Sequence, residues 1–201
     1  MIRKLLPLTE NKLRILLYIY EKKETHLQEI SKNLKIHPYS LQKTIKSLKL
    51  VLEERKAGKT ILLSLDKKQP DYPDLLSTIE DYKLKTKDKI LNLLLRNLQE
   101  LFSKDKNVLS CLVFGSYARE AVKESSDIDL LFVVKRKDKG LLKKCSHLST
   151  LLGKEINPLV FNEKQFKEVL RIKEPAITSL LEPTQRLIIL SREYFLKLEN
   201  I

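Results

Sequence analysis

The 201-residue sequence has no tryptophan, only four glycines and two cysteines, and no long uncharged apolar run. A membrane-spanning helix needs about 18 or more consecutive apolar residues, so the sequence excludes an integral helical membrane protein. The start of the chain lacks the apolar core and cleavage site of a signal peptide, and we expect a cytoplasmic protein. Because Cys111 and Cys145 have no C-x-x-C spacing, we expect two reduced thiols rather than a disulfide or a zinc site.

The net charge of +13 is concentrated in the first third of the chain. Residues 1–70 hold 16 Lys and Arg against 7 Asp and Glu, whereas residues 71–201 hold 23 against 19. A positive surplus favours a polyanionic partner, because lysine and arginine neutralise phosphates and release counterions. A positive net charge is compatible with nucleic acid binding and also with general solubility, so the pattern of residues has to distinguish the two.

Three helical patterns and a hairpin fill the first third of the chain. Thr9 is a candidate N-cap for the first helix, Thr25 and Gln28 have the capping-box spacing for the second, and the third begins beside Pro38. Two apolar, strand-like runs follow, and the turn between them, residues 56–59, is basic.

This order resembles the winged helix-turn-helix of many archaeal and bacterial regulators. The resemblance implies that the third helix enters the major groove of DNA and that the hairpin contacts phosphates. The residues that it assigns to DNA are Tyr39, Ser40, Gln42, Lys43, Lys46, Lys56 and Lys59. Winged helices also serve as dimerisation and docking modules, so a protein-binding module with a lysine face is the alternative. The oligomeric state stays open, although winged helices that bind operators often work as homodimers.

The segment KKQPDYPD, residues 67–74, predicts a domain boundary because two prolines interrupt the apolar patterns. The expected domains are residues 1–70 and 71–201, and the second begins with a helical lead-in at about 74–102. Ile90, Leu94, Leu98 and Leu101 follow a helical spacing there, and the segment also has apolar leucines at positions 93, 94, 95 and 98. We expect these four leucines to pack against the following sheet rather than to form an oligomer seam.

The stretch LVFGSYAREAVKESSDIDLLFVV, residues 112–134, places two acidic residues inside the most apolar part of the chain. Alternate residues of a strand share a face, so Asp127 and Asp129 are expected to lie about 6 to 7 Å apart on one side. Two such carboxylates either raise one pKa or share a cation, and Mg²⁺ binds one or two carboxylates together with substrate phosphates. Upstream, Gly115 lets the backbone approach a ligand, and Ser116 offers a hydroxyl at a helix start, where free N–H groups favour phosphate.

A Gly-Ser turn followed by Asp-x-Asp in an apolar strand resembles the nucleotidyltransferases related to DNA polymerase beta, most closely their minimal branch. The resemblance spans about residues 90–199 and implies a mixed β-sheet with flanking helices. The whole chain is therefore expected to be an α+β protein, with a winged helix before the sheet domain. It also implies that Gly115 and Ser116 hold nucleotide phosphates and that Asp127 and Asp129 bind Mg²⁺. Arg119 would contact phosphate, with an exposed helical arginine as the alternative.

The third carboxylate of this family is the point where the sequence departs from the resemblance. In the next strand candidate, KEINPLVF, Asn157 occupies the place where the resemblance implies an acid. Glu155 lies two residues earlier on the same face of an extended strand, and it is the candidate third catalytic residue. A solvated charge at the strand end is the alternative for Glu155.

The resemblance implies Mg²⁺-dependent transfer of a nucleoside monophosphate, AMP from ATP, to a hydroxyl of a protein, an RNA or a small molecule. In minimal relatives the implied acceptor is often a tyrosine of a HEPN-type toxin, so the chain would act as an antitoxin that binds its own promoter. The alternative is a nucleotidyltransferase fold without turnover that serves as a nucleotide sensor or a DNA-binding transcriptional regulator.

Overall fold

The computed structural model describes residues 7–85, 89–102, 104–119 and 121–198. Contacts divide the chain into two compact units, Met1–Tyr82 and Lys83–Ile201, and the division lies within helix α5 (Tyr72–Lys85). The sequence placed the boundary at the prolines before this helix, and the extents of the functional domains stay a prediction. Among the described residues, none of the helices combines the length and the apolar character needed to cross a bilayer.

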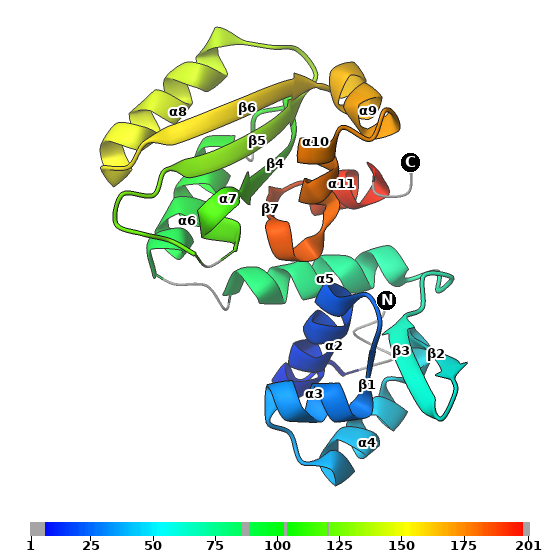
Figure 1. Cartoon of the computed structure of the whole chain (residues 1–201). Helices are drawn as coiled ribbons and strands as arrows, with labels where there is room; N and C mark the ends of the chain where they lie inside the picture. The colour runs from blue at the N-terminus through cyan, green and yellow to red at the C-terminus, as the bar shows by residue number, and fades with distance from the viewer. Residues whose placement is uncertain (1–6, 86–88, 103, 120, 199–201) are drawn as a thin grey trace. The chain divides into compact units, whose positions relative to one another are not determined.

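The first unit contains the expected three helices and hairpin, with an additional short strand (Figure 1). Its elements before α5 are α2 (Glu10–Lys22), β1 (Thr25–His26), α3 (Leu27–Leu34), α4 (Pro38–Ser47), the 3-10 turn η1 (Lys49–Val51), β2 (Leu52–Ala57) and β3 (Thr60–Leu65). The three strands form an antiparallel sheet in the order β1-β3-β2. Gly58 has a φ of 61° in the turn between β2 and β3, a conformation that glycine adopts without steric cost.

The start of α3 differs from the capping box expected at Thr25. Thr25 lies in β1 and pairs with Leu63 of β3, and its hydroxyl donates to Glu29 Oε2 at 2.8 Å. The cap is instead His26, whose Nδ1 accepts the Glu29 backbone N–H at 3.1 Å. The short strand therefore sets the position at which the helix begins.

The second unit is a four-stranded mixed sheet with helices, in agreement with the expected α+β class. Its elements are α6 (Lys89–Phe102), β4 (Val108–Phe114), α7 (Gly115–Ala118), β5 (Ile128–Val134), α8 (Lys139–Leu152), β6 (Ile156–Asn162), α9 (Glu163–Arg171), α10 (Pro175–Thr178), the 3-10 turns η2 (Ser179–Leu181) and η3 (Pro183–Gln185), β7 (Leu187–Leu190) and α11 (Arg192–Leu198). The strand order is β6-β5-β4-β7. Only the β5–β6 pair is parallel among the described strands of this sheet.

The core of the second unit forms between this sheet and the helices α6 and α8, and it includes both cysteines. Burial raises the pKa of Cys145 in α8 to about 11, and it raises the pKa of Cys111 in β4 well above its usual value. Both thiols are free, as expected from their spacing.

Helix α6 buries three of the four leucines that were expected to pack against the sheet. Leu94, Leu95 and Leu98 are buried, whereas the side chain of Leu93 is 54% exposed. A run of three consecutive leucines covers more of the helix circumference than one apolar face, so one of them has to point outward. The expectation was therefore wrong for Leu93.

This difference predicts unequal effects of two chemically identical substitutions. Leu94→Ala leaves a cavity in the core and should lower the free energy of unfolding by about 2 to 5 kcal/mol. Leu93→Ala removes the same atoms from the surface and should change it by about 0.5 kcal/mol or less. Urea unfolding of both variants measures the difference, and equal losses would show that Leu93 is covered in solution.

Candidate active site

The two central strands of the second unit bring the candidate site together. Asp129 is the second residue of β5, where it pairs with Phe114 of β4 on one side and with Asn157 of β6 on the other. The carboxylate thus lies beside the point where β4 ends and α7 begins. Asp129 is partly exposed, whereas its neighbours Ile128 and Leu130 are fully buried on the other face.

Gly115 is packed directly against this carboxylate. Its φ of 69° is a left-handed conformation, and a Cβ atom built on it would overlap Asp129 Oδ2 and lie 3.2 Å from Asp129 Cγ. A side chain at position 115 would therefore displace the acid as well as strain the turn. The structure thus gives this glycine a steric role in addition to the close ligand approach expected from the sequence.

The pKa of Asp129 is raised above its ordinary value. Burial is the largest cause, because it disfavours the charged form, and the nearby charge of Asp127 raises the pKa further. A hydrogen bond from Asn157 and the charge of Arg119 act in the opposite direction. Three other residues that were singled out in the sequence thus act on the Asp129 carboxylate.

Asp127 was expected inside the strand, but β5 begins one residue later, at Ile128. Asp127 is exposed and lies at the end of the segment that connects α7 to β5. Ser116 is partly exposed in the four-residue helix α7, and Arg119 is exposed immediately after it. The two carboxylates therefore have different environments, one solvated and one partly buried.

Glu155 and Asn157 occupy different positions relative to Asp129. Asn157 is its cross-strand neighbour and hydrogen-bond partner, whereas Glu155 is exposed and precedes β6. The backbone of Glu155 does support the site, since its carbonyl accepts the Ile128 N–H at 2.8 Å. Among the described residues, no three His, Cys, Asp or Glu side chains gather closely enough to hold a metal ion together. Glu155 as a catalytic residue stays a prediction.

Lys154 is a contributor that the sequence reasoning missed. Its ammonium group donates to the backbone carbonyl of Glu124, in the segment that leads to Asp127. This contact fastens that segment to the start of β6. The sequence offered no signal for it, because the two residues are 30 positions apart.

The side chains that were assigned to DNA are exposed in the first unit. Tyr39, Ser40, Gln42, Lys43 and Lys46 are exposed on α4, with Tyr39 at 74%, while Leu41 and Ile45 of the same helix are buried. Lys56 is exposed on β2 and Lys59 in the hairpin turn. The helix therefore presents the predicted residues to solvent, and DNA binding by them stays a prediction.

Two comparisons with known proteins found a similarity. Residues 96–177 match the family model described as "Polymerase beta, Nucleotidyltransferase". A crystal structure from Sulfolobus solfataricus, described as a "putative nucleotidyltransferase", is similar with 25% identity and a TM-score of 0.29, over 40% of this chain and 73% of that chain. No curated protein matches the chain. The matched segment contains Gly115, Asp127, Asp129 and Asn157, and residues 96–177 are therefore similar to the polymerase beta nucleotidyltransferase family.

Proposed function

We propose that the second unit catalyses Mg²⁺-dependent transfer of a nucleoside monophosphate, AMP from ATP, to a hydroxyl acceptor. The observation that carries the proposal is the seating of Asp129 against Gly115, with Asp127 close enough to raise its pKa. This arrangement unites the glycine turn with the two acids in the segment that matches the nucleotidyltransferase family.

The donor set at this site fits magnesium. Mg²⁺ favours oxygen ligands and is bound through one or two carboxylates together with substrate phosphates, so Asp127 and Asp129 suffice on the protein side. The raised pKa of Asp129 is consistent with this role, because a cation would stabilise the ionised form that burial disfavours. When bound, Mg²⁺ would neutralise charge on the triphosphate and on the departing pyrophosphate.

The protein groups would act by positioning and by accepting a proton. The Gly115 turn and the Ser116 hydroxyl would hold phosphate oxygens, and Arg119 would add positive charge. The acceptor hydroxyl oxygen would then attack the α-phosphorus, the bond to the bridging oxygen would break, and pyrophosphate would leave. The hydroxyl proton would pass to a carboxylate, for which Glu155 is the candidate.

The first unit, we infer, is a winged helix that binds DNA. Its three helices, its three-stranded antiparallel sheet and its basic turn support this reading, together with the exposed lysines of α4. An antitoxin that modifies a tyrosine of a HEPN-type partner and represses its own promoter combines both activities. Such a protein would act as a homodimer on a two-fold operator.

A second candidate function rests on Asn157. An amide in the cross-strand position beside Asp129 cannot act as a general base, and the described residues provide no third acid within metal-binding distance. A domain of this kind could bind nucleotide without turnover and serve as a sensor for a DNA-binding regulator. Binding and transfer therefore have to be measured separately.

Nucleotide binding is predicted to need both aspartates. Calorimetry with a non-hydrolysable ATP analogue should show binding that requires Mg²⁺ and weakens about tenfold or more in Asp127→Ala/Asp129→Ala, because the metal ligands are lost. Glu100→Ala/Glu124→Ala is the matched control, since both acids are exposed and the change in charge is the same. Equal affinity in the two variants would contradict the proposed site.

Transfer is predicted to depend on Glu155 if this residue accepts the proton. Glu155→Gln should lower labelled AMP transfer to a cell extract by roughly 10² to 10⁴-fold while nucleotide binding stays unchanged. Glu124→Gln provides the same chemical change at an exposed position of the neighbouring loop. Transfer that is absent in the unchanged protein but accompanied by tight ATP binding would favour the sensor.

DNA binding is predicted to be strongly salt-dependent. If Lys43, Lys46, Lys56 and Lys59 each neutralise one phosphate, affinity should fall roughly a hundredfold for a fourfold increase in salt. Lys43→Glu/Lys46→Glu should abolish binding, whereas Lys32→Glu/Lys67→Glu, with the same change in charge, should retain most of it. A flat salt response in an electrophoretic or anisotropy assay would point to a protein partner.

A further inference from the structure

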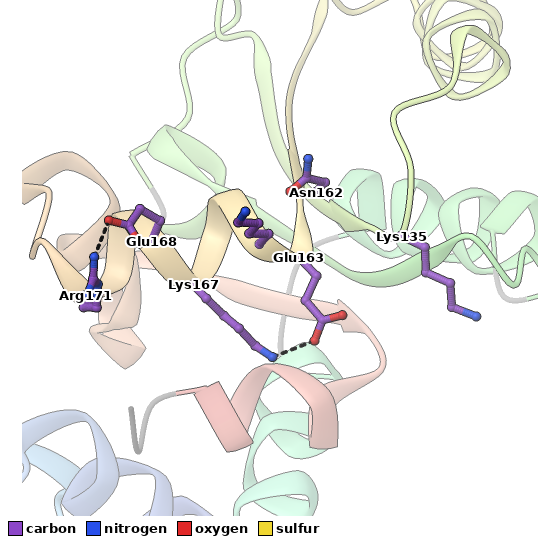
Figure 2. Close-up of a pocket in the computed structure, with 7 residues that line it drawn as sticks. Lys135, Asn162, Glu163, Lys167, Glu168 and Arg171 are labelled. Atoms are coloured by element: carbon purple, nitrogen blue, oxygen red, sulfur yellow. Dashed lines mark hydrogen bonds and ion pairs between the residues drawn. The ribbon is translucent and has the colours of Figure 1, made fainter.

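A second cluster of functional groups lies at the other end of the two parallel strands. Because β5 and β6 are parallel, both end at the same edge of the sheet, about 20 Å along the strands from Asp129. At this edge, Lys135 follows β5 and Asn162 leads from β6 into α9, and together with α9 they line a pocket of about 670 Å³ (Figure 2). We call this surface the basic edge. It comprises Lys135, Arg136, Lys137, Lys164, Lys167 and Arg171.

The acidic groups of the basic edge already have cationic partners. Lys167 pairs with Glu163 at 2.8 Å, and Arg171 pairs with Glu168 at 2.8 Å, as the dashed lines in Figure 2 show. The charge of Lys164 also acts on Glu168, since it helps to lower the pKa of that carboxyl. The other three cations form no ion pair with a side chain in the described part of the chain; they are Lys135, Arg136 and Lys137. At these three residues the surface therefore carries positive charge that pairs with no described acid.

An apolar pocket adjoins this charged pocket. It has a volume of about 400 Å³ and is lined by Phe161 and Val169, with Lys137 and Lys164 among its other lining residues. Lys164 and Glu168 line both pockets, so the two pockets share part of their lining. The partly exposed ring of Phe161 packs against buried Phe166 at a centroid distance of 5.8 Å, so it has a fixed support. Both volumes lie in the range of ordinary ligand sites.

We propose that the basic edge binds a single strand of nucleic acid, with phosphates at Lys135 and Lys164 and an unpaired base against Phe161. Proteins that bind single strands combine a cationic groove with an aromatic side chain on which a base stacks, and both components are present here. An acidic peptide would use the charges but not the aromatic pocket, and a duplex has no unpaired base to offer. The proposal is independent of the catalytic site and of the predicted DNA surface on α4.

The test uses the full chain with Lys43→Glu/Lys46→Glu in every sample, so that the predicted DNA surface does not contribute. Anisotropy of a labelled poly-uridine strand should show micromolar or tighter binding that falls about tenfold or more in Lys135→Glu/Lys164→Glu and has a shallower salt dependence. Lys164→Glu alone should weaken binding more than Arg96→Glu, an equal change in charge on the exposed face of α6. Equal effects of these two single variants would overturn the proposal.

The aromatic component is tested separately from charge. Phe161→Leu keeps the pocket apolar but removes the ring, and it should weaken single-strand binding about fivefold or more. Val169→Glu, at another lining residue of the apolar pocket, should weaken it as well, and thermal melting of both variants checks that they fold. A duplex of the same length, or inorganic polyphosphate, should compete poorly. Competition by either one as effective as that of the single strand would show a general polyanion surface and refute the assignment.

Discussion

The contact between the Asp129 carboxylate and the backbone of Gly115 is the constraint on which the candidate active site depends. The acid occupies the space that any side chain at position 115 would fill, so the Asp129 carboxylate can take this position only while residue 115 is glycine. The turn in turn sets where α7 begins, because β4 ends at Phe114 beside Asp129. A single steric fit therefore fixes the relative positions of the phosphate-loop candidate and of the metal-ligand candidate.

In the parallel strands of the sheet, the buried apolar residues and the candidate functional residues occupy different positions. Residues 130–134 of β5 are all buried, and they hold the sheet between its covering helices. The charged groups of the two parallel strands lie at their ends, with Asp127 and Asp129 at the start of β5 and Lys135 after its end. The proposed cation and the proposed nucleic acid would therefore bind at opposite ends of the strands and would not compete for the same surface.

Local patterns were enough to predict much of this architecture. Helical spacing identified α2, α3 and α4, and strand alternation placed Asp129 on the opposite face from Ile128 and Leu130. The error at Leu93 has a local cause in helix geometry, whereas other outcomes were decided by a distant segment. The two-residue strand β1 exists because β3 pairs with it. This pairing places Thr25 in a strand, so Thr25 does not cap α3 although its spacing to Gln28 fits a capping box. The hydrogen bond between Asn157 and Asp129 and the meeting of Lys135 with α9 likewise depend on cross-strand register, which one sequence does not display.

The burial of both native thiols has a practical consequence for solution work. Alkylating reagents attack the exposed thiolate, and neither Cys111 nor Cys145 offers one at neutral pH. We therefore expect maleimides to leave both native cysteines of the folded chain unmodified. A single cysteine introduced on α4 or beside Lys135 could carry a fluorophore or a spin label, which would allow each unit to be observed without first engineering the core.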